Sequence, residues 1–461
     1  MSQYDYDLVV LGSGPAGQKG AICAAKLGKR AAIIEKKWMG GVCVHTGTIP
    51  SKTLREAVLY LTGFSQRTFY GKAYALKEQI KMQDLTFRVQ AVIKTETDVI
   101  QAQLRRNGVV TVEGEARFVD DHTVEITNGL GSQRITSQNF LVAVGTRPAA
   151  NKDIQIDGRR IFDSDQLLSI EHIPKDLIVV GAGVIGLEYA SMLAPLGVKI
   201  TLLDGRPTIL DFVDREIMDN LCFQLRQHGM TFRLGEKVVE CRIDEERNRV
   251  VAKLESGKTI HGEALLYTVG RQGNSDRLGL ENVGLAQGDR GKIDVDECFK
   301  TSVDSIYAAG DIIGFPALAS TSMEQGRIAS CNMFGVHSRM QPQFFPYGIY
   351  TIPEISMVGK SEEQLTREKV PYEVGIARYG ELAKGQMLGD DTGLLKLLFH
   401  AESRKLLGVH VIGERAAEIV HIGQVVLSFD GRIDYFRDTV FNYPTLAEAY
   451  KVAALDGLNR L

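Results

Sequence analysis

The pattern of hydrophobic positions repeats itself along the chain. Residues 6–17 read YDLVVLGSGPAG and residues 175–186 read KDLIVVGAGVIG, two apolar runs that each end in G-x-G-x-x-G. An alanine-rich helical stretch follows each run, and a second apolar strand then ends in an acidic residue. Glu35 lies 23 residues after Gly12, as Asp204 lies 23 residues after Gly181. Two copies of one βαβ unit predict two dinucleotide sites.

The remaining chain predicts an α/β protein with further strands and helices. A long helical segment is expected over 54–106. Short strands are expected over 109–147, and the last of them ends in FLVAVGTRP. Helical residues are expected over 207–230 and strands over 231–270, ending in ALLYTVGR. From about residue 345 the pattern predicts strands, an amphipathic helix in ERAAEIVHIGQVVLSF and a last helix after Pro444 and Thr445.

Composition narrows the function classes. The 461 residues carry a net charge of −3 and no basic run, so neither nucleic acid nor an anionic membrane is a favoured partner. Apolar stretches are interrupted before about 18 residues, and the start MSQYDYDLVVLG has no basic leader, so a cytoplasmic protein without membrane spans is expected. The six cysteines show neither C-x-x-C nor metal spacing, and no metal is predicted.

The first glycine cluster has a direct physical interpretation. Gly12 permits a tight turn, Gly14 lets the backbone approach a pyrophosphate, and Gly17 lets helix and strand pack closely. Glu35 stands where a carboxylate accepts hydrogen bonds from an adenosine ribose. The alternative, a glycine-rich turn without ligand, is disfavoured by the flanking strand, helix and acidic residue.

The second cluster repeats this argument with Gly181, Gly183 and Gly186. Asp204 at the strand end favours the free ribose hydroxyl of NAD, whereas Arg206 is suited to the 2′-phosphate of NADP. Arg206 as a solvated loop residue stays open as an alternative.

Residues 40–52, GGVCVHTGTIPSK, resemble the redox segment G-G-x-C-x-x-x-x-C-x-P-S-K of the pyridine nucleotide–disulfide oxidoreductases, such as lipoamide dehydrogenase and glutathione reductase. The resemblance spans essentially the whole chain and includes TSVDSIYAAGD (301–311) and the C-terminal P-T-x-x-E. It implies FAD at the first glycine cluster and NAD(P) at the second. By this likeness Asp311 holds the FAD ribityl chain, and Lys52 approaches the flavin and pairs with Glu188. Gly145 is assigned to FAD binding and Gly270 to NAD(P) binding.

Two departures from that family pattern bear on function. The second redox cysteine is Thr48 here, and the histidine that precedes P-T is Tyr443, although Glu448 is kept. Cys43 therefore has no local disulfide partner, because a threonine hydroxyl cannot serve as a thiolate near neutral pH. Tyrosine, with a pKa near 10, cannot replace the proton-shuttling imidazole.

The loss of both groups favours hydride transfer from one nicotinamide to the flavin and back to another. Within the family the sequence is most similar to the soluble, si-specific pyridine nucleotide transhydrogenases, through GTIPSK, GIYTIPEIS, GERAAEI and FNYPT. The implied reaction is NADPH + NAD⁺ ⇌ NADP⁺ + NADH. Lys52 would then stabilise the anionic reduced flavin, with Glu188 orienting it.

Alternatives remain: a lipoamide-dehydrogenase-like or single-cysteine enzyme that uses Cys43, a diaphorase, or an idle flavoprotein that serves assembly. The family resemblance implies two Rossmann-like domains and a C-terminal α/β dimerisation domain, in a homodimer or larger homo-oligomer. The expected division is FAD domain 1–155, NAD(P) domain 156–274, FAD domain continued 275–344 and interface domain 345–461.

Overall fold

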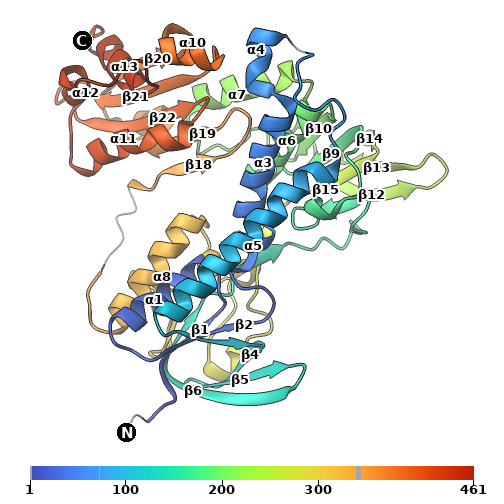
Figure 1. The fold of residues 1–461 in the computed structure, drawn as a ribbon, viewed down its shortest axis with the longest axis vertical. Helices are drawn as coiled ribbons and strands as arrows, with labels where there is room; N and C mark the ends of the chain where they lie inside the picture. The colour runs from blue at the N-terminus through green and yellow to red at the C-terminus, as the bar shows by residue number, and fades with distance from the viewer. Residues whose placement is uncertain (1–2, 72, 339–343) are drawn as a thin grey trace. The chain divides into compact units, whose positions relative to one another are not determined.

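A computed structural model describes residues 3–71, 73–338 and 344–461. The chain divides into two compact units (Figure 1). The first consists of Met1–Thr53, Thr86–Ala150 and Val269–Met340, and the second of Leu54–Leu85, Asn151–Thr268 and Gln341–Leu461. Both are therefore assembled from segments far apart in the sequence.

The first unit is built on a sheet in the order β3-β2-β1-β6-β5-β4, with β17 paired to β6. Parallel pairing joins β3, β2, β1, β6 and β17, while β4 and β5 are antiparallel. The strands are β1 (Tyr6–Leu11), β2 (Ala31–Glu35), β3 (Val110–Glu113), β4 (Glu115–Asp120), β5 (Thr123–Asn128), β6 (Gly131–Val142) and β17 (Ile306–Ala308). A further short pair consists of β7 (Thr146–Pro148) and β16 (Arg271–Gly273).

Continuous apolar runs explain the centre of this sheet. Leu8, Val9 and Val10 of β1 are fully buried, as are Phe140 and Leu141 of the neighbouring β6. Parallel strands covered on both faces need such runs rather than alternation. Helices α1 (Pro15–Lys26) and α8 (Ala319–Met333) belong to this unit and lie side by side (Figure 1).

The second unit contains a wholly parallel sheet in the order β11-β10-β9-β15-β8. Its strands are β8 (Ile161–Asp163), β9 (Asp176–Val180), β10 (Lys199–Asp204), β11 (Thr231–Leu234) and β15 (Ala264–Tyr267). Helices α6 (Val184–Leu193) and α7 (Arg215–Gln227) follow β9 and β10. An antiparallel sheet is added by β12 (Val238–Asp244), β13 (Arg249–Leu254) and β14 (Thr259–Gly262).

The C-terminal part of the second unit has an antiparallel sheet in the order β18-β19-β22-β21-β20. The strands are β18 (Tyr347–Ile349), β19 (Ile355–Gly359), β20 (Tyr372–Arg378), β21 (Leu394–His400) and β22 (Leu406–Ile412). Its helices are α9 (Glu362–Arg367), α10 (Ala383–Leu388), α11 (Ala416–Ser428), α12 (Asp434–Asp438) and α13 (Glu448–Leu458). Tyr379, Phe399, Phe436 and Tyr450 are buried in one hydrophobic core there.

The helices expected over 54–106 are interrupted. The structure has α3 (Thr48–Thr62), α4 (Arg67–Tyr70) and α5 (Met82–Arg106), preceded by α2 (Gly41–His45). Gly63 and Gly71 adopt positive φ angles of 57° and 89° after α3 and α4, which ends each helix. The helix expected over 207–230 covers only α7, because Asp214 caps its first turn by accepting from the Glu216 N–H.

Candidate functional site

The first glycine loop connects β1 to α1 and uses each glycine differently. Gly12 has a φ of 99°, and a Cβ there would lie 2.5 Å from the Ala143 carbonyl oxygen. A Cβ on Gly17 would lie 1.9 Å from the Gly12 carbonyl oxygen, so helix and strand pack too closely for any side chain. Gly14, by contrast, meets no atom within 4 Å. The loop thus leaves its open space at Gly14, the glycine that the sequence predicts a pyrophosphate to approach.

Glu35 at the end of β2 faces this loop. Its Oε2 accepts hydrogen bonds from the Ser13 N–H at 3.0 Å and the Ser13 hydroxyl at 2.7 Å. Ser13 Oγ in turn accepts from the Gly40 N–H at 2.9 Å. The carboxylate predicted to bind ribose is therefore fixed beside the glycine loop, and the same serine connects that loop to the segment that begins at Gly40.

The second glycine loop, between β9 and α6, has the same geometry. Gly181 has a φ of 104°, and a Cβ on Gly186 would lie 2.0 Å from the Gly181 carbonyl oxygen. Gly183 meets no atom within 4 Å. The agreement extends to the acidic residue, because Asp204 Oδ2 accepts from the Ala182 N–H at 2.7 Å. Both copies of the repeat therefore form the same kind of loop.

Asp204 and Arg206 form a bidentate ion pair at the end of β10. Arg206 donates from Nε to Oδ1 at 3.0 Å and from Nη2 to Oδ2 at 2.8 Å. Burial on its own would raise the pKa of Asp204, but hydrogen bonds from Arg206 and the Ala182 N–H hold that pKa below its ordinary value. The Asp204 side chain is 9% exposed and that of Arg206 is 55% exposed. The guanidinium therefore presents a solvent-accessible cation beside an ionised acceptor.

The redox segment runs through α2 into α3 without a second thiol. Cys43 lies in α2, and the Thr48 hydroxyl, at the start of α3, hydrogen-bonds its sulfur. Burial raises the pKa of Cys43, against the opposing effects of this hydrogen bond and of the Lys52 charge. A half-buried thiol with a hydroxyl beside it in place of a second thiol cannot form the disulfide of the family pattern.

Asp311 begins the turn after β17, where Gly310 has a φ of 84°. Ser322 donates to its Oδ1 at 3.4 Å and Thr146 to its Oδ2 at 3.5 Å, both long bonds. Burial raises the pKa of this carboxyl, and the charge of Arg271 opposes that rise. Asp311 is thus a half-buried acceptor with weak internal partners.

FAD fits the open features of this unit. The Thr46 hydroxyl is buried and has no hydrogen-bond partner within the described part of the chain, and buried polar groups are nearly always paired. Together with the empty space at Gly14 and the weakly bonded Asp311, it offers polar contacts to a bound dinucleotide. Thr46 did not stand out in the sequence, since its unpaired hydroxyl is visible only in three dimensions.

Two further predicted glycines lie in the first unit. Gly145 has a φ of 64° and accepts from the Asn274 N–H at 3.1 Å. Gly270, predicted to bind NAD(P), has a φ of 85° and accepts from the Ala149 N–H at 3.2 Å. A Cβ on Gly270 would lie 2.5 Å from the Arg290 guanidinium. These two glycines therefore lie where two segments of the first unit meet.

Glu188 has a partner that the sequence did not reveal, the backbone N–H of Tyr350. This carboxylate on α6 is 4% exposed and its Oε1 accepts from the Tyr350 N–H at 2.8 Å. Nearby, Ser191 Oγ accepts from the Ile352 N–H at 3.0 Å. Glu188 thus fixes the chain between β18 and β19. Lys52, half-buried on α3, belongs to the other compact unit, and its pairing with Glu188 stays a prediction.

Tyr443 is exposed, with 74% of its surface accessible in the single chain, and Glu448 is the first residue of α13. An exposed aromatic ring at this position is suited to a contact outside the chain.

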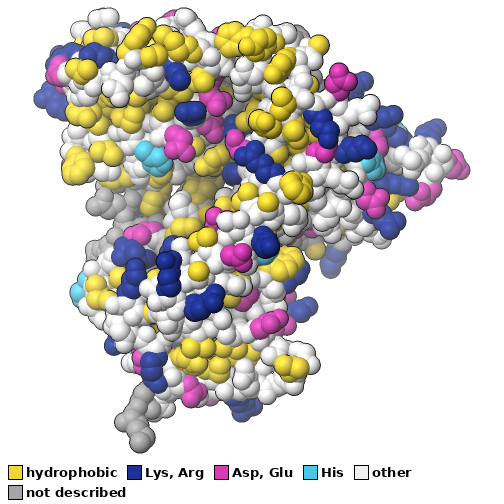
Figure 2. Space-filling model, in the orientation of Figure 1, with side chains coloured by type: hydrophobic (Ala, Val, Ile, Leu, Met, Phe, Trp, Pro, Cys, Tyr) yellow, Lys and Arg dark blue, Asp and Glu magenta, His cyan; other side chains and the backbone are white. Residues whose placement is uncertain are grey.

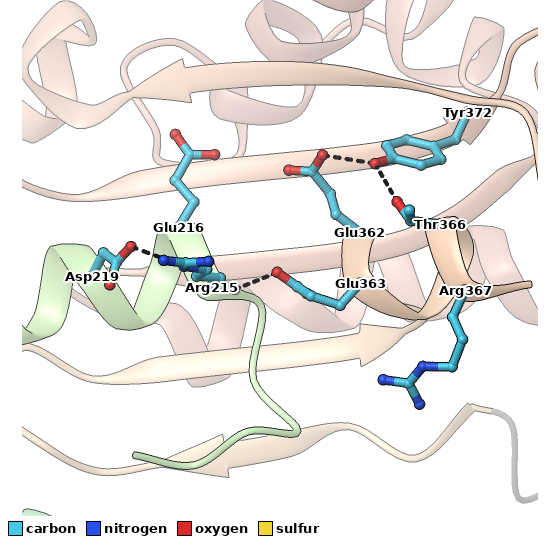
Figure 3. A pocket seen from close by; sticks show the side chains of 8 residues that line it. All are labelled: Arg215, Glu216, Asp219, Glu362, Glu363, Thr366, Arg367 and Tyr372. Atoms are coloured by element: carbon cyan, nitrogen blue, oxygen red, sulfur yellow. Dashed lines mark hydrogen bonds and ion pairs between the residues drawn. The ribbon is translucent and has the colours of Figure 1, made fainter. Parts of the chain in front are cut away.

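An open hollow of about 690 Å³ lies elsewhere in the second unit, between α7 and α9 (Figure 3). It is lined by Arg215, Glu216, Asp219, Glu362, Glu363, Thr366, Arg367 and Tyr372. Figure 3 shows Tyr372 donating to Glu362, at 3.0 Å, and Arg215 between Asp219 and Glu363.

A buried lysine underlies this hollow. Lys396 on β21 is 1% exposed and donates to Asp214 at 2.9 Å, with Glu216 at 3.0 Å and Glu362 also in contact. Within the described residues these three carboxylates are near enough to share a metal ion, but the ammonium group already lies among them. The charged side chains beneath the hollow therefore form an ion-pair network around Lys396 rather than a metal centre. This network lies apart from both glycine loops in the sequence.

Comparison with known proteins identifies the family. The model of the pyridine nucleotide-disulphide oxidoreductases matches residues 6–326, and that of their dimerisation domain matches residues 345–454. The chain belongs to this family.

Among the described residues no helix is long and apolar enough to cross a membrane.

Curated relatives similar over the whole chain are named soluble pyridine nucleotide transhydrogenases. A soluble pyridine nucleotide transhydrogenase of Mycobacterium bovis is 51% identical over 460 residues, covering 99% of this chain and 98% of the relative. Those of Colwellia psychrerythraea and Pseudomonas aeruginosa are 43% and 44% identical, covering 99% and 100% of both chains.

Solved structures of the family have the same fold. LpdA of Mycobacterium tuberculosis is 26% identical, with a TM-score of 0.90 over 97% of this chain and 98% of its own. The HOCl-induced flavoprotein disulfide reductase RclA of Escherichia coli is also 26% identical, with a TM-score of 0.87 over 98% and 99%. These likenesses confirm the predicted class of two dinucleotide-binding domains and a dimerisation domain.

Proposed function

We propose that this protein is an FAD-dependent transhydrogenase that moves a hydride from NADPH to NAD⁺ and in the reverse direction. The observation that carries the proposal is the combination of two intact dinucleotide loops with a hydroxyl in place of the second redox thiol. The relatives at 43–51% identity support it by name. The lipoamide-dehydrogenase-like and diaphorase readings are not favoured.

Bound FAD supplies the chemistry of accepting and returning a hydride. The chain's own residues bind and orient. In the proposal the loop at Gly14 holds the FAD pyrophosphate, Glu35 holds its ribose, and Asp311 accepts from its ribityl hydroxyls. The loop at Gly183 holds one nicotinamide dinucleotide at a time, with Asp204 and Arg206 at its adenosine end.

The division into domains at 1–155, 156–274, 275–344 and 345–461 is part of the proposal. The boundary near 344 adjoins residues 339–343, which lie outside the described residues.

A homodimer is proposed as well. The matched dimerisation domain supports it, and so do exposed hydrophobic side chains in the same stretch, namely Val425, Phe429, Tyr435, Val440 and Tyr443. Figure 2 shows hydrophobic side chains gathered over the C-terminal part of the chain. Sedimentation of the holoenzyme tests this assembly.

A cytoplasmic location completes the proposal and is supported by the relatives' description as soluble.

One assay separates the candidate functions. The holoenzyme receives NADPH with NAD⁺, and NADH formation is followed, while parallel reactions contain NAD⁺ with dihydrolipoamide, or NADPH with a quinone. The expected result is fast formation of NADH from NAD⁺ with NADPH as the hydride donor, and no oxidation of dihydrolipoamide. Turnover of dihydrolipoamide, or of quinone alone, would overturn the assignment.

The number of electrons stored by each subunit follows from Thr48. Anaerobic titration is expected to end after one two-electron equivalent per FAD, because Cys43 has a hydroxyl beside it rather than a thiol. No thiolate-to-flavin charge-transfer band should appear in the visible spectrum. Uptake of a second equivalent together with such a band would contradict this account of the redox segment.

Cofactor discrimination should depend on Arg206. Arg206→Ala is expected to lower kcat/KM for NADPH by about ten- to a hundredfold and to change that for NADH little, because a charge-assisted hydrogen bond contributes roughly 1.5–3 kcal/mol. Asp204→Asn should instead lower kcat/KM for NADH more than that for NADPH. The asparagine retains an acceptor for the Ala182 N–H.

Arg249 provides a matched control, since it forms another bidentate pair in the same unit, with Asp176 at 2.8 and 3.0 Å at the opposite end of the sheet. Arg249→Ala should leave the ratio of kcat/KM for NADPH to kcat/KM for NADH unchanged. Equal losses with both cofactors in Arg206→Ala would mean that the side chain only holds the loop.

A further inference from the structure

Helices α1 and α8 approach each other closely because small residues line their contact (Figure 1). A Cβ on Gly326 would lie 2.0 Å from the Ala16 carbonyl oxygen, and one on Gly20 would lie 3.3 Å from the Gly326 carbonyl oxygen. The Ser330 hydroxyl donates to the Gly20 carbonyl oxygen at 2.8 Å. The helix backbones therefore meet with almost no side chain between them.

Two thiols face each other one turn further along this contact. Cys23 Sγ on α1 lies 3.5 Å from Cys331 Sγ on α8. Cys331 is 6% exposed, whereas Cys23 is half-buried and more accessible. The Arg327 guanidinium lies 3.6 Å from Cys331 Sγ. The two residues are 308 positions apart in the sequence, so no local motif indicates the pair.

We propose that Cys23 and Cys331 are a reversible disulfide site, distinct from the redox segment at Cys43. With hydrogen peroxide as oxidant, the Cys23 thiolate attacks one peroxide oxygen, forms a sulfenic acid and releases hydroxide. The Cys331 thiol then attacks the Cys23 sulfur, the S–S bond forms, and water leaves. Two thiols lose two electrons and two protons, and one peroxide becomes two waters.

The geometry makes this bond accessible without unfolding. A disulfide needs its sulfur atoms about 2.05 Å apart, so these two Sγ atoms, 3.5 Å apart across a contact lined by glycines, have only about 1.5 Å to close. The half-buried Cys23 meets the oxidant first, and the buried Cys331 resolves its sulfenic acid. Cys23 lies nine residues beyond Gly14, about 13 Å along the helix at 1.5 Å per residue, so FAD should stay bound.

The reaction should be slow at neutral pH and faster in base. Burial and the hydrogen bond with Cys331 raise the pKa of Cys23 to about 11, although Arg327 opposes this. Because only the thiolate reacts, the rate should rise about tenfold per pH unit from pH 7 to 9.

The test uses the holoenzyme and hydrogen peroxide. After oxidation and denaturation, thiol titration should find four of the six thiols, and proteolysis should yield one linked peptide that contains Cys23 and Cys331. Dithiothreitol should restore six. Cys331→Ser should lose the linked peptide, and Cys298→Ser, the matched control, should retain it.

Three results would overturn the proposal: six thiols remaining at pH 9, a linked peptide that joins other cysteines, or the same linkage yield in Cys331→Ser. Since Cys23→Ser and Cys331→Ser change one atom each, FAD content measured in both variants verifies that they are folded.

Discussion

Replacing Lys396 with alanine is expected to lower the free energy of unfolding by about 3–5 kcal/mol, because the variant leaves a buried carboxylate without its counter-charge. Lys396 and Asp214 are each 1% exposed and lie 2.9 Å apart. Asp214 also caps the first turn of α7. Denaturant unfolding of the holoenzyme, followed by far-UV circular dichroism, measures the change.

The matched control is Lys360→Ala, which removes a lysine of the same unit from an exposed ion pair with Glu368. Both of those side chains are nearly half exposed, so a loss of at most about 1 kcal/mol is expected. Lys396→Met combined with Asp214→Asn should recover part of the stability, since it removes the two fully buried charges of the network together. A loss below 1 kcal/mol in Lys396→Ala would mean that water solvates the network.

The sign of the pH dependence gives an independent check. Burial would raise the pKa of Asp214, but the charges of His410 and Lys396 hold it below its ordinary value. In the wild type this carboxylate therefore contributes stability above its unfolded pKa, and the contribution is lost as the pH falls through the folded pKa. Without Lys396 that pKa should be higher than in the wild type, because one of the charges that lower it is gone, so the deficit of Lys396→Ala should shrink below about pH 4.

The sequence predicted the parts of this site that local patterns encode. Both glycine loops, with Glu35 and Asp204, follow from strand, turn and helix signals within about 30 residues. The lack of a second thiol was also visible in Thr48. The structure adds what each glycine of these two loops does, since among those six only Gly14 and Gly183 would meet no atom within 4 Å of an added Cβ.

Contacts between distant segments could not be predicted in this way. Lys396 meets Asp214 across 182 positions, and Glu188 meets Tyr350 across 162. Lys396 is the one charged residue within the apolar run of LLKLLFH, and nothing in that run indicates which partner its buried side chain meets. Such pairs depend on which elements the fold brings together, which periodicity along the chain does not record.

Lys52→Ala is expected to slow flavin reduction by NADPH about 10²–10³-fold, the range found when one preorganised group that stabilises developing negative charge is removed. Lys52 lies one helical turn after Thr48 in α3, and its charge reaches the Cys43 thiol. A cation held here favours the anionic reduced form of a flavin bound in the first unit. Stopped-flow absorbance of the flavin under anaerobic conditions measures the rate.

Three further variants separate charge from position. Lys52→Arg keeps the charge and should retain most of the rate, and Lys94→Ala, an exposed lysine on α5, should retain all of it. Glu188→Gln removes a charge but keeps an acceptor for the Tyr350 N–H, so its smaller loss would report on Lys52 orientation rather than on the chain that Glu188 fixes.

FAD content decides how a slow Lys52→Ala variant is interpreted. The groups proposed to bind FAD, at Gly14, Glu35 and Asp311, are unchanged, so the flavin should remain bound and its midpoint potential should fall, because the reduced anion loses more stabilisation than the oxidised form. Unchanged rate and potential would make Lys52 a packing residue of α3. Loss of FAD together with the rate would make it a binding residue, and the electrostatic role would fall.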